Sequence, residues 1–218
     1  MKLLLTSAGI TNESIKKALA GLIKKPFEET NLAYIPTAAN IEKGDKDWLI
    51  SDLVNCQKCN FKQVDIVDFS AIPREMWLSR LEYADVLLFG GGNTDHLLKT
   101  VKSSGLEEAL PGLLKTRVYV GISAGSMITA FKESLSSAAL LYHEETGEIK
   151  DNKALGYVNF QTRPHLNSEY FPKVTLPYLA EIAKELSDTF YAIDDQTAIQ
   201  VIDSEITIIS EGEWKKFN

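Results

Sequence analysis

The stretch "YVGISAGSMIT", residues 119–129, begins with apolar and β-branched residues, continues through a cluster of small residues, and ends in a second apolar run. This pattern predicts a buried strand, a sharp turn over residues 121–125 and the start of a helix. A strand that leads directly into a helix is the repeating unit of a parallel α/β sheet. The stretch therefore predicts the fold class, provided that the rest of the chain repeats the unit.

Similar units recur along the chain. The alternation of apolar runs and helical spacing predicts an α/β fold with a mostly parallel, doubly wound sheet that carries helices on both faces. Two β-rich runs around Asp203 predict a C-terminal antiparallel hairpin, and the mixed pattern of residues 132–152 predicts a surface excursion. Strands are expected at residues 2–8, 32–38, 64–69, 85–92, 117–123 and 190–195, and helices at residues 13–25, 48–58, 94–110 and 176–186.

Length and charge restrict the kind of protein. The 218 residues, of which 44% are hydrophobic, are enough for one compact domain over residues 1–218. A net charge of −7 provides no basic surface for nucleic acid or for an anionic membrane. The first ten residues are too short an apolar run for a signal peptide or a membrane span. We therefore expect a cytoplasmic monomer or homodimer whose partner is a small molecule.

The two cysteines, Cys56 and Cys59, lie in "NCQKCN". A structural zinc site needs four ligands, and the sequence has no second pair, so we expect no metal. A Cys-x-x-Cys pair can carry redox chemistry. The pair lies in a polar, helical stretch, which favours thiols without a role in the function and a reducing compartment.

Ser123 is the central residue of the G-x-S-x-G pattern at residues 121–125. In a nucleophile elbow, the serine lies in a strained strand-to-helix turn, where larger neighbours would collide. The same turn directs the N–H groups of the following helix toward one point, where they can stabilise an oxyanion. A tight turn whose serine caps the helix explains the pattern equally well.

A glycine-rich loop, "FGGGNTDHLL", follows the strand expected at residues 85–92. It lacks the spacing of a dinucleotide fingerprint and the Lys-Ser/Thr of a P-loop. The glycines can expose backbone N–H donors, which favours the second half of an oxyanion hole. Alternatively, the loop is a turn in which Asn93 or Thr94 caps the next helix. We also expect Asn93 to bind substrate.

A histidine and two aspartates complete the candidate site. His165 follows Arg163 and Pro164 in a loop after the run "YVNF", which we expect to be a strand, and proline can fix the direction of such a loop. Asp194 and Asp195 end the strand expected at residues 190–195. His96 and His143 lie in a helix and in the surface excursion, and we expect them to have no catalytic role.

The serine, the histidine and one aspartate together fit acyl transfer. A serine hydroxyl needs a base within hydrogen-bond reach, and the base needs a carboxylate that fixes its tautomer. An α/β-hydrolase places its acid between the serine and a late histidine. In this chain no histidine follows His165, so the order Ser123, His165, Asp195 argues against an α/β-hydrolase.

Four ordered motifs, "FGGGNTDHLL", "VGISAGSMIT", "RPHLN" and "AIDDQTAI", resemble those of the peptidase E (aspartyl dipeptidase) family of serine peptidases, to which cyanophycinase is related. The resemblance implies a fold like that of class I glutamine amidotransferases. We expect no cofactor. It implies Ser123 as nucleophile, His165 as base and Asp195 as acid. It further implies oxyanion donors from Gly91 or Gly92 and from Ala124.

The chain departs from the family pattern in two ways. The family acid is usually a glutamate, so Asp194 is an alternative to the shorter Asp195. The arginines that follow the histidine in peptidase E are absent, and Arg163 is the nearest candidate to bind an acidic substrate. We therefore expect a serine peptidase for dipeptides or other short amides that cleaves aspartyl dipeptides weakly. The alternative is a small-molecule-binding or regulatory protein without turnover.

Overall fold

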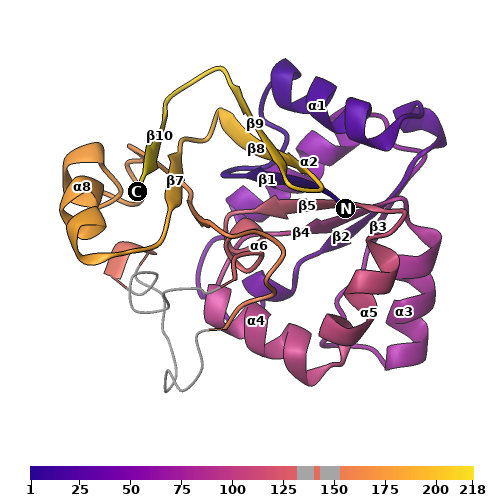
Figure 1. Ribbon diagram of the computed structural model, residues 1–218. Coiled ribbons are helices and arrows are strands. Elements are labelled where there is room, and N and C mark those ends of the chain that lie inside the picture. Colours follow the sequence, from indigo (N-terminus) through magenta and orange to yellow (C-terminus); the bar gives the residue numbers. More distant parts are fainter. Residues whose placement is uncertain (132–139, 143–152) are drawn as a thin grey trace.

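The computed structural model describes residues 1–131, 140–142 and 153–218 (Figure 1). Most of the surface excursion expected at residues 132–152, including His143, therefore lies outside the described residues. Two sheets are present, and the larger one has the strand order β3-β2-β4-β5-β1-β8-β9. Its strands are β1 (Lys2–Thr6), β2 (Asn31–Ile35), β3 (Gln63–Ile66), β4 (Val86–Phe89), β5 (Val118–Ile122), β8 (Thr197–Ile202) and β9 (Glu205–Ser210).

The larger sheet is mostly parallel, as the sequence predicts. The strands β3, β2, β4, β5 and β1 pair in parallel, while β8 is antiparallel to β1 and β9 is antiparallel to β8. The antiparallel hairpin expected near the C-terminus is thus β8 and β9, which extend the sheet beyond β1. Because successive side chains of a strand point to opposite faces, both faces of the buried strands need a cover.

Helices cover both faces of the larger sheet, with α1 above it and α3, α4 and α5 below it in Figure 1. On β1, Leu4 packs with α1 and α2 residues such as Ile15 and Cys56, whereas Leu3 and Leu5 pack with the other helices. The helices are α1 (Glu13–Ile23), α2 (Asp47–Lys58), α3 (Arg74–Tyr83), α4 (Thr94–Ser103), α5 (Leu106–Leu113) and α6 (Ala124–Met127), with 3-10 turns η1 (Phe27–Glu29) and η2 (Thr37–Ala39).

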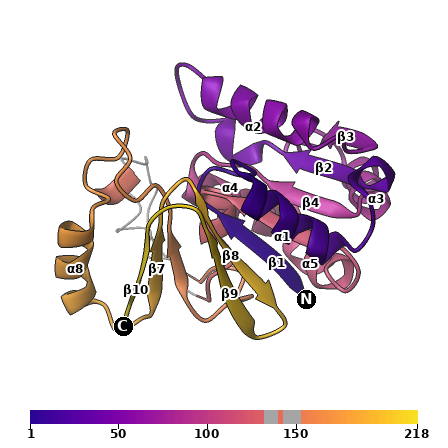
Figure 2. The ribbon, with the colours of Figure 1, turned by 90° about the horizontal axis from the view of Figure 1, so that it is seen from above.

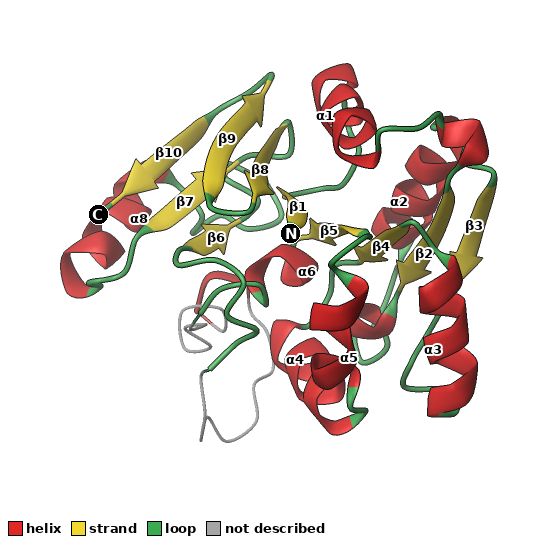
Figure 3. Cartoon of the chain, turned by 45° about the vertical axis from the view of Figure 1, so that its right-hand side comes forward, coloured by secondary structure: helices red, strands yellow, loops and turns green. Residues whose placement is uncertain are grey.

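A second, three-stranded sheet lies beside the hairpin (Figures 2 and 3). It has the order β10-β7-β6, and α8 (Leu176–Glu185) packs near it. Its strands are β6 (Gln161–Arg163), β7 (Phe190–Ile193) and β10 (Trp214–Phe217). The apolar run at residues 190–193 is thus a strand, as predicted, but it belongs to this sheet and not to the larger one.

Three local predictions differ from the structure. The helix expected at residues 94–110 is two helices, because Gly105 adopts φ +76° between them and ends the first. The run "YVNF" contains only an isolated bridge at Val158, and the strand before His165 is the shorter β6. The helix α3 was not predicted, because only Trp77 and Leu81 of its ten residues are buried and the apolar pattern is weak.

Cys56 on α2 and Cys59, which directly follows α2, are both free and buried. Burial raises the pKa of each thiol, which keeps the thiols protonated and unreactive near neutral pH. This placement favours thiols that serve as packing residues. In the described part of the chain, each helix is too short or too polar to cross a membrane.

Candidate active site

Part of the site lies at the carboxyl ends of three neighbouring strands of the larger sheet. Ser123 follows β5 directly, Ser7 follows β1, and Gly91 follows β4 after one residue. Since β4, β5 and β1 are adjacent and parallel, their carboxyl ends meet at one edge of the sheet. This edge is where open α/β sheets bind ligands.

Ser123 occupies a strained turn between β5 and α6. Its backbone has φ 49° and ψ −109°, and its side chain makes no capping hydrogen bond to the helix. A Cβ added to Gly121 would lie 2.6 Å from the Ser126 nitrogen, and one added to Gly125 would lie 2.1 Å from the Phe89 oxygen. The two glycines of the motif are therefore required by close backbone contacts, and the helix-capping explanation of the serine is wrong.

Three side chains form one hydrogen-bonded series. His165 Nε2 lies 2.9 Å from Ser123 Oγ, and His165 Nδ1 lies 2.8 Å from Asp195 Oδ1. Because a carboxylate only accepts, Nδ1 carries the proton and Nε2 is free to accept from the serine hydroxyl. Ser123 is half-buried.

Ser7 holds the histidine and the aspartate together. Its hydroxyl donates to Asp195 Oδ1 at 2.5 Å and accepts from the His165 backbone N–H at 2.7 Å. Thr11 fixes the backbone of Asp195, because its hydroxyl donates to the Asp195 carbonyl oxygen at 2.7 Å. The sequence analysis missed Ser7, which is fully buried. The signal for it was a hydroxyl residue directly after the first strand.

Asp194 has other partners. Its carboxylate accepts from the backbone N–H of Gln196 and Glu213 and from the Thr197 hydroxyl. These bonds fix the turn before β8 and the start of β10, so Asp195 is the aspartate that contacts His165. Partial burial raises the pKa of Asp195, but the hydrogen bond and charge of His165 and the Ser7 hydroxyl outweigh it and lower that pKa below the ordinary value.

Aromatic rings fix the imidazole from outside the sheet. Phe171 stacks on His165 with the ring centroids 4.8 Å apart and an interplanar angle of 30°. Tyr142 contacts both rings edge-on. His165 itself has φ +63°, directly after Pro164, and this backbone directs its side chain toward Ser123.

The glycine loop after β4 lies against the serine. A Cβ added to Gly91 would lie 3.4 Å from the Ser123 Cβ, whereas one added to Gly92 would collide with Ala38. In the described part of the chain, no backbone hydrogen bond uses the N–H of Gly91 or Gly92. Ala124 is the first residue of α6, so its N–H has no partner within the helix. Gly91 is therefore the loop glycine that is best placed to act with Ala124 as an oxyanion donor.

The two residues expected to bind substrate are both buried. Asn93 is 1% exposed and caps α4, with its side-chain oxygen accepting from the His96 N–H at 2.9 Å. Arg163 is also 1% exposed, and its guanidinium donates to the side chain of Gln161. These placements favour structural roles for Asn93 and Arg163, and their contact with substrate stays a prediction.

A second carboxylate is buried close to the site. Asp52 on α2 is 8% exposed and accepts a hydrogen bond from the Tyr34 hydroxyl at 3.3 Å. Burial raises its pKa to about 7, the Tyr34 hydrogen bond opposes the rise, and the negative charge of Asp195 adds to it. A carboxyl group in this position destabilises the fold when it ionises.

We expect Asp52→Asn to stabilise the protein at alkaline pH. In the unfolded protein the Asp52 carboxyl ionises from about pH 4, whereas in the folded protein it ionises only near pH 7. The free-energy cost of burying this carboxyl therefore grows between these two pH values and is constant above them. The free energy of unfolding of the variant, relative to wild type, should rise by about 2 kcal/mol between pH 5.5 and pH 8.5. Urea unfolding at both pH values measures it. The exposed Asp47→Asn on the same helix is the control, and an equal pH trend in both variants would contradict the prediction.

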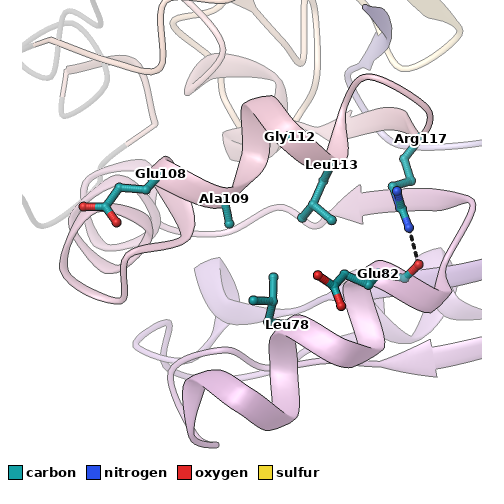
Figure 4. Close-up of a pocket in the computed structure, with 7 residues that line it drawn as sticks. All are labelled: Leu78, Glu82, Glu108, Ala109, Gly112, Leu113 and Arg117. Atoms are coloured by element: carbon teal, nitrogen blue, oxygen red, sulfur yellow. Dashed lines mark hydrogen bonds between the residues drawn. The ribbon is translucent and has the colours of Figure 1, made fainter.

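A groove among the described residues lies elsewhere. It has a volume of about 480 Å³ and runs between Leu78 on α3 and Leu113 on α5, next to Arg117 (Figure 4). Arg117 precedes β5 and donates to the Glu82 carbonyl, whereas Ser123 follows β5. The groove therefore lies at the opposite end of the strand from the site, and it contains none of the candidate residues.

A serine hydrogen-bonded to a His–Asp pair at the carboxyl edge of an α/β sheet is an arrangement typical of serine hydrolases. A model of peptidase family S51 matches residues 3–209, and the chain belongs to this family. It is a serine-type peptidase, and the resemblance to the peptidase E family is confirmed.

The chain is similar in sequence to known peptidases and similar in fold to a solved structure. The "Uncharacterized peptidase Lin0382" of Listeria innocua is 27% identical over 192 residues, which are 84% of this chain and 86% of that protein. The "Peptidase E" of Streptomyces coelicolor is 34% identical over 89 residues, 40% of this chain and 35% of that protein. The crystal structure of a protein from Listeria monocytogenes EGD-e has the same fold, with a TM-score of 0.80 at 21% identity, covering 97% of this chain and 98% of that one.

Proposed function

We propose that this peptidase hydrolyses dipeptides or other short amides through Ser123, His165 and Asp195. The observation that carries the proposal is the hydrogen-bonded series of 2.9 Å and 2.8 Å that joins the three side chains. Ser123 Oγ attacks the carbonyl carbon while its proton passes to His165 Nε2, and Asp195 stabilises the resulting imidazolium.

The oxyanion that forms is held by the N–H groups of Gly91 and Ala124. The C–N bond then breaks, and the proton on His165 passes to the leaving amine. Water attacks the acyl-enzyme by the reverse sequence and releases Ser123. The substrate is a small peptide, and we propose a cytoplasmic monomer or homodimer with no nucleic-acid or membrane partner.

Labelling with a small fluorophosphonate tests the proposal. The reagent should attach to Ser123, as mass spectrometry of the digested protein would show, and prior acylation should block it. A binding protein without turnover would remain unlabelled. Labelling at another serine, or none at millimolar reagent, would contradict the proposal.

We expect weak cleavage of aspartyl dipeptides. A substrate carboxylate needs a cationic partner when it leaves water, and arginine serves this need best. The four arginines of the chain are engaged elsewhere, since Arg163 is buried beside Gln161 and the other three contact Asp65 or the carbonyls of Gly105 and Glu82.

Steady-state kinetics on Asp-Leu, Ala-Leu and Leu-Leu measure this expectation. The kcat/KM for Asp-Leu should be no higher than for the two apolar dipeptides, because a buried carboxylate without a partner costs several kcal/mol. A preference for Asp-Leu of about a hundredfold or more, equivalent to about 2.7 kcal/mol, would show the expectation wrong.

A further inference from the structure

We infer that Trp48 determines specificity by forming the wall that receives the side chain of the acyl residue, the substrate residue whose carbonyl Ser123 attacks. The inference rests on the proposed function and extends it to the class of substrate. Trp48 lies in the first turn of α2 and is 39% exposed, which is unusual for an indole that packs beside a buried loop.

The indole reaches the loop that flanks the nucleophile. A Cβ built on Gly91 would lie 3.8 Å from Trp48 Cζ3 and 3.4 Å from the Ser123 Cβ. Trp48 Cζ3 and the Ser123 Cβ therefore both lie within van der Waals distance of the same point beside Gly91. The absence of a side chain at Gly91 leaves the indole open toward the reacting serine.

The strand order assigns Trp48 to the acyl side of the site. The loop with Gly91 follows β4, on one side of β5, whereas Ser7, which holds His165 and Asp195, follows β1 on the other side. Figure 2 shows α2, β2 and β4 on one side of β1, and the hairpin and second sheet on the other. Since His165 must protonate the leaving amine, the leaving group lies toward β1 and the acyl residue toward β4 and α2.

The chemistry of this wall favours an apolar or aromatic acyl residue. An indole face contributes a large apolar contact with little loss of side-chain entropy. The arginines are engaged elsewhere, so no guanidinium among the described residues is directed at the same position. Both observations lead to the same expectation, a preference for large apolar acyl groups over acidic or very small ones.

Esters with a constant leaving group test the inference. We compare p-nitrophenyl acetate with p-nitrophenyl 3-phenylpropionate for wild type, Trp48→Ala and Trp48→Phe. In Trp48→Ala, kcat/KM for the phenylpropionate should fall about tenfold to a hundredfold while the acetate changes less than about threefold, and Trp48→Phe should recover most of the loss. Ile50→Ala, two residues along and 57% exposed on another face of α2, is the matched control and should change neither ester.

Two further measurements distinguish a failure of the role of Trp48 from a failure of the proposed peptidase function. Rates with Ala-Leu and Ala-Gly, which differ only in the leaving residue, should change by the same factor in Trp48→Ala. Equal losses on both esters, or a loss that follows the leaving residue, would overturn the role of Trp48 while fluorophosphonate labelling of Ser123 still supports the peptidase. An unlabelled wild-type protein would instead overturn the proposed function.

Discussion

Replacing Ser123 with alanine is expected to lower kcat/KM for any substrate of this peptidase by about 10⁵-fold to 10⁶-fold. Without Oγ no acyl-enzyme forms, and only binding and the oxyanion donors remain to accelerate direct attack by water. The fold should be unaffected, because the side chain makes no cap and alanine tolerates the backbone angles at position 123 no worse than serine does. Hydrolysis of a p-nitrophenyl ester and a thermal melt of the same sample measure both effects.

Ser126→Ala is the matched control for this prediction. Ser126 lies three residues further on, and its hydroxyl donates to the Thr6 carbonyl at 2.8 Å. Its loss should cost about 1 kcal/mol of stability and leave most of the activity. Turnover above about 1% of wild type in Ser123→Ala, with Ser126→Ala as the weaker enzyme, would remove Ser123 from the role of nucleophile.

The part of the site that could be predicted lies where small residues follow buried strands. The run at residues 119–129 predicts the turn at Ser123 because the G-x-S-x-G pattern places a glycine two residues before and two residues after the serine. Gly121 is required by its contact with Ser126, and Gly125 by its contact with Phe89 of β4. The same holds for the loop at Gly91, which follows β4. Ser7 escaped prediction because one serine after a strand is common, and its two partners lie 158 and 188 residues away in the chain.

The second sheet could not be predicted for a related reason. The apolar run of β7 indicates that residues 190–193 are buried, but it does not indicate which strands pair with them. The pairing with β6 and β10 depends on contacts between distant segments. Asp195 nevertheless reaches His165, because it lies in the connection from β7 to β8 and β8 pairs with β1. In this connection the chain passes from the second sheet to the larger one. The apolar pattern of the single strands does not indicate such a passage.

The second large effect is expected on kcat, and it should distinguish Asp195 from Asp194. Asp195→Ala is expected to lower kcat about 10⁴-fold, because the imidazole loses the acceptor that keeps the proton on Nδ1 and the charge that stabilises the imidazolium. Asp194→Ala should keep kcat within about tenfold of wild type and lose stability instead, since its carboxylate holds the Gln196 and Glu213 N–H groups and the Thr197 hydroxyl.

A pH profile distinguishes a catalytic carboxylate from a structural one. The pKa of Asp195 is lowered in the folded protein, so its contribution is complete above the ordinary aspartate pKa and is lost only as the pH falls through the lower folded value. Asp195 is therefore ionised throughout pH 5 to 9. In Asp195→Ala the imidazole of His165 loses this neighbouring charge, so the dependence of kcat on pH in this range should change shape, while in Asp194→Ala it should match wild type. The reverse pattern, with kcat lost in Asp194→Ala and kept in Asp195→Ala, would assign the acid to Asp194 and require the turn before β8 to rearrange when substrate binds.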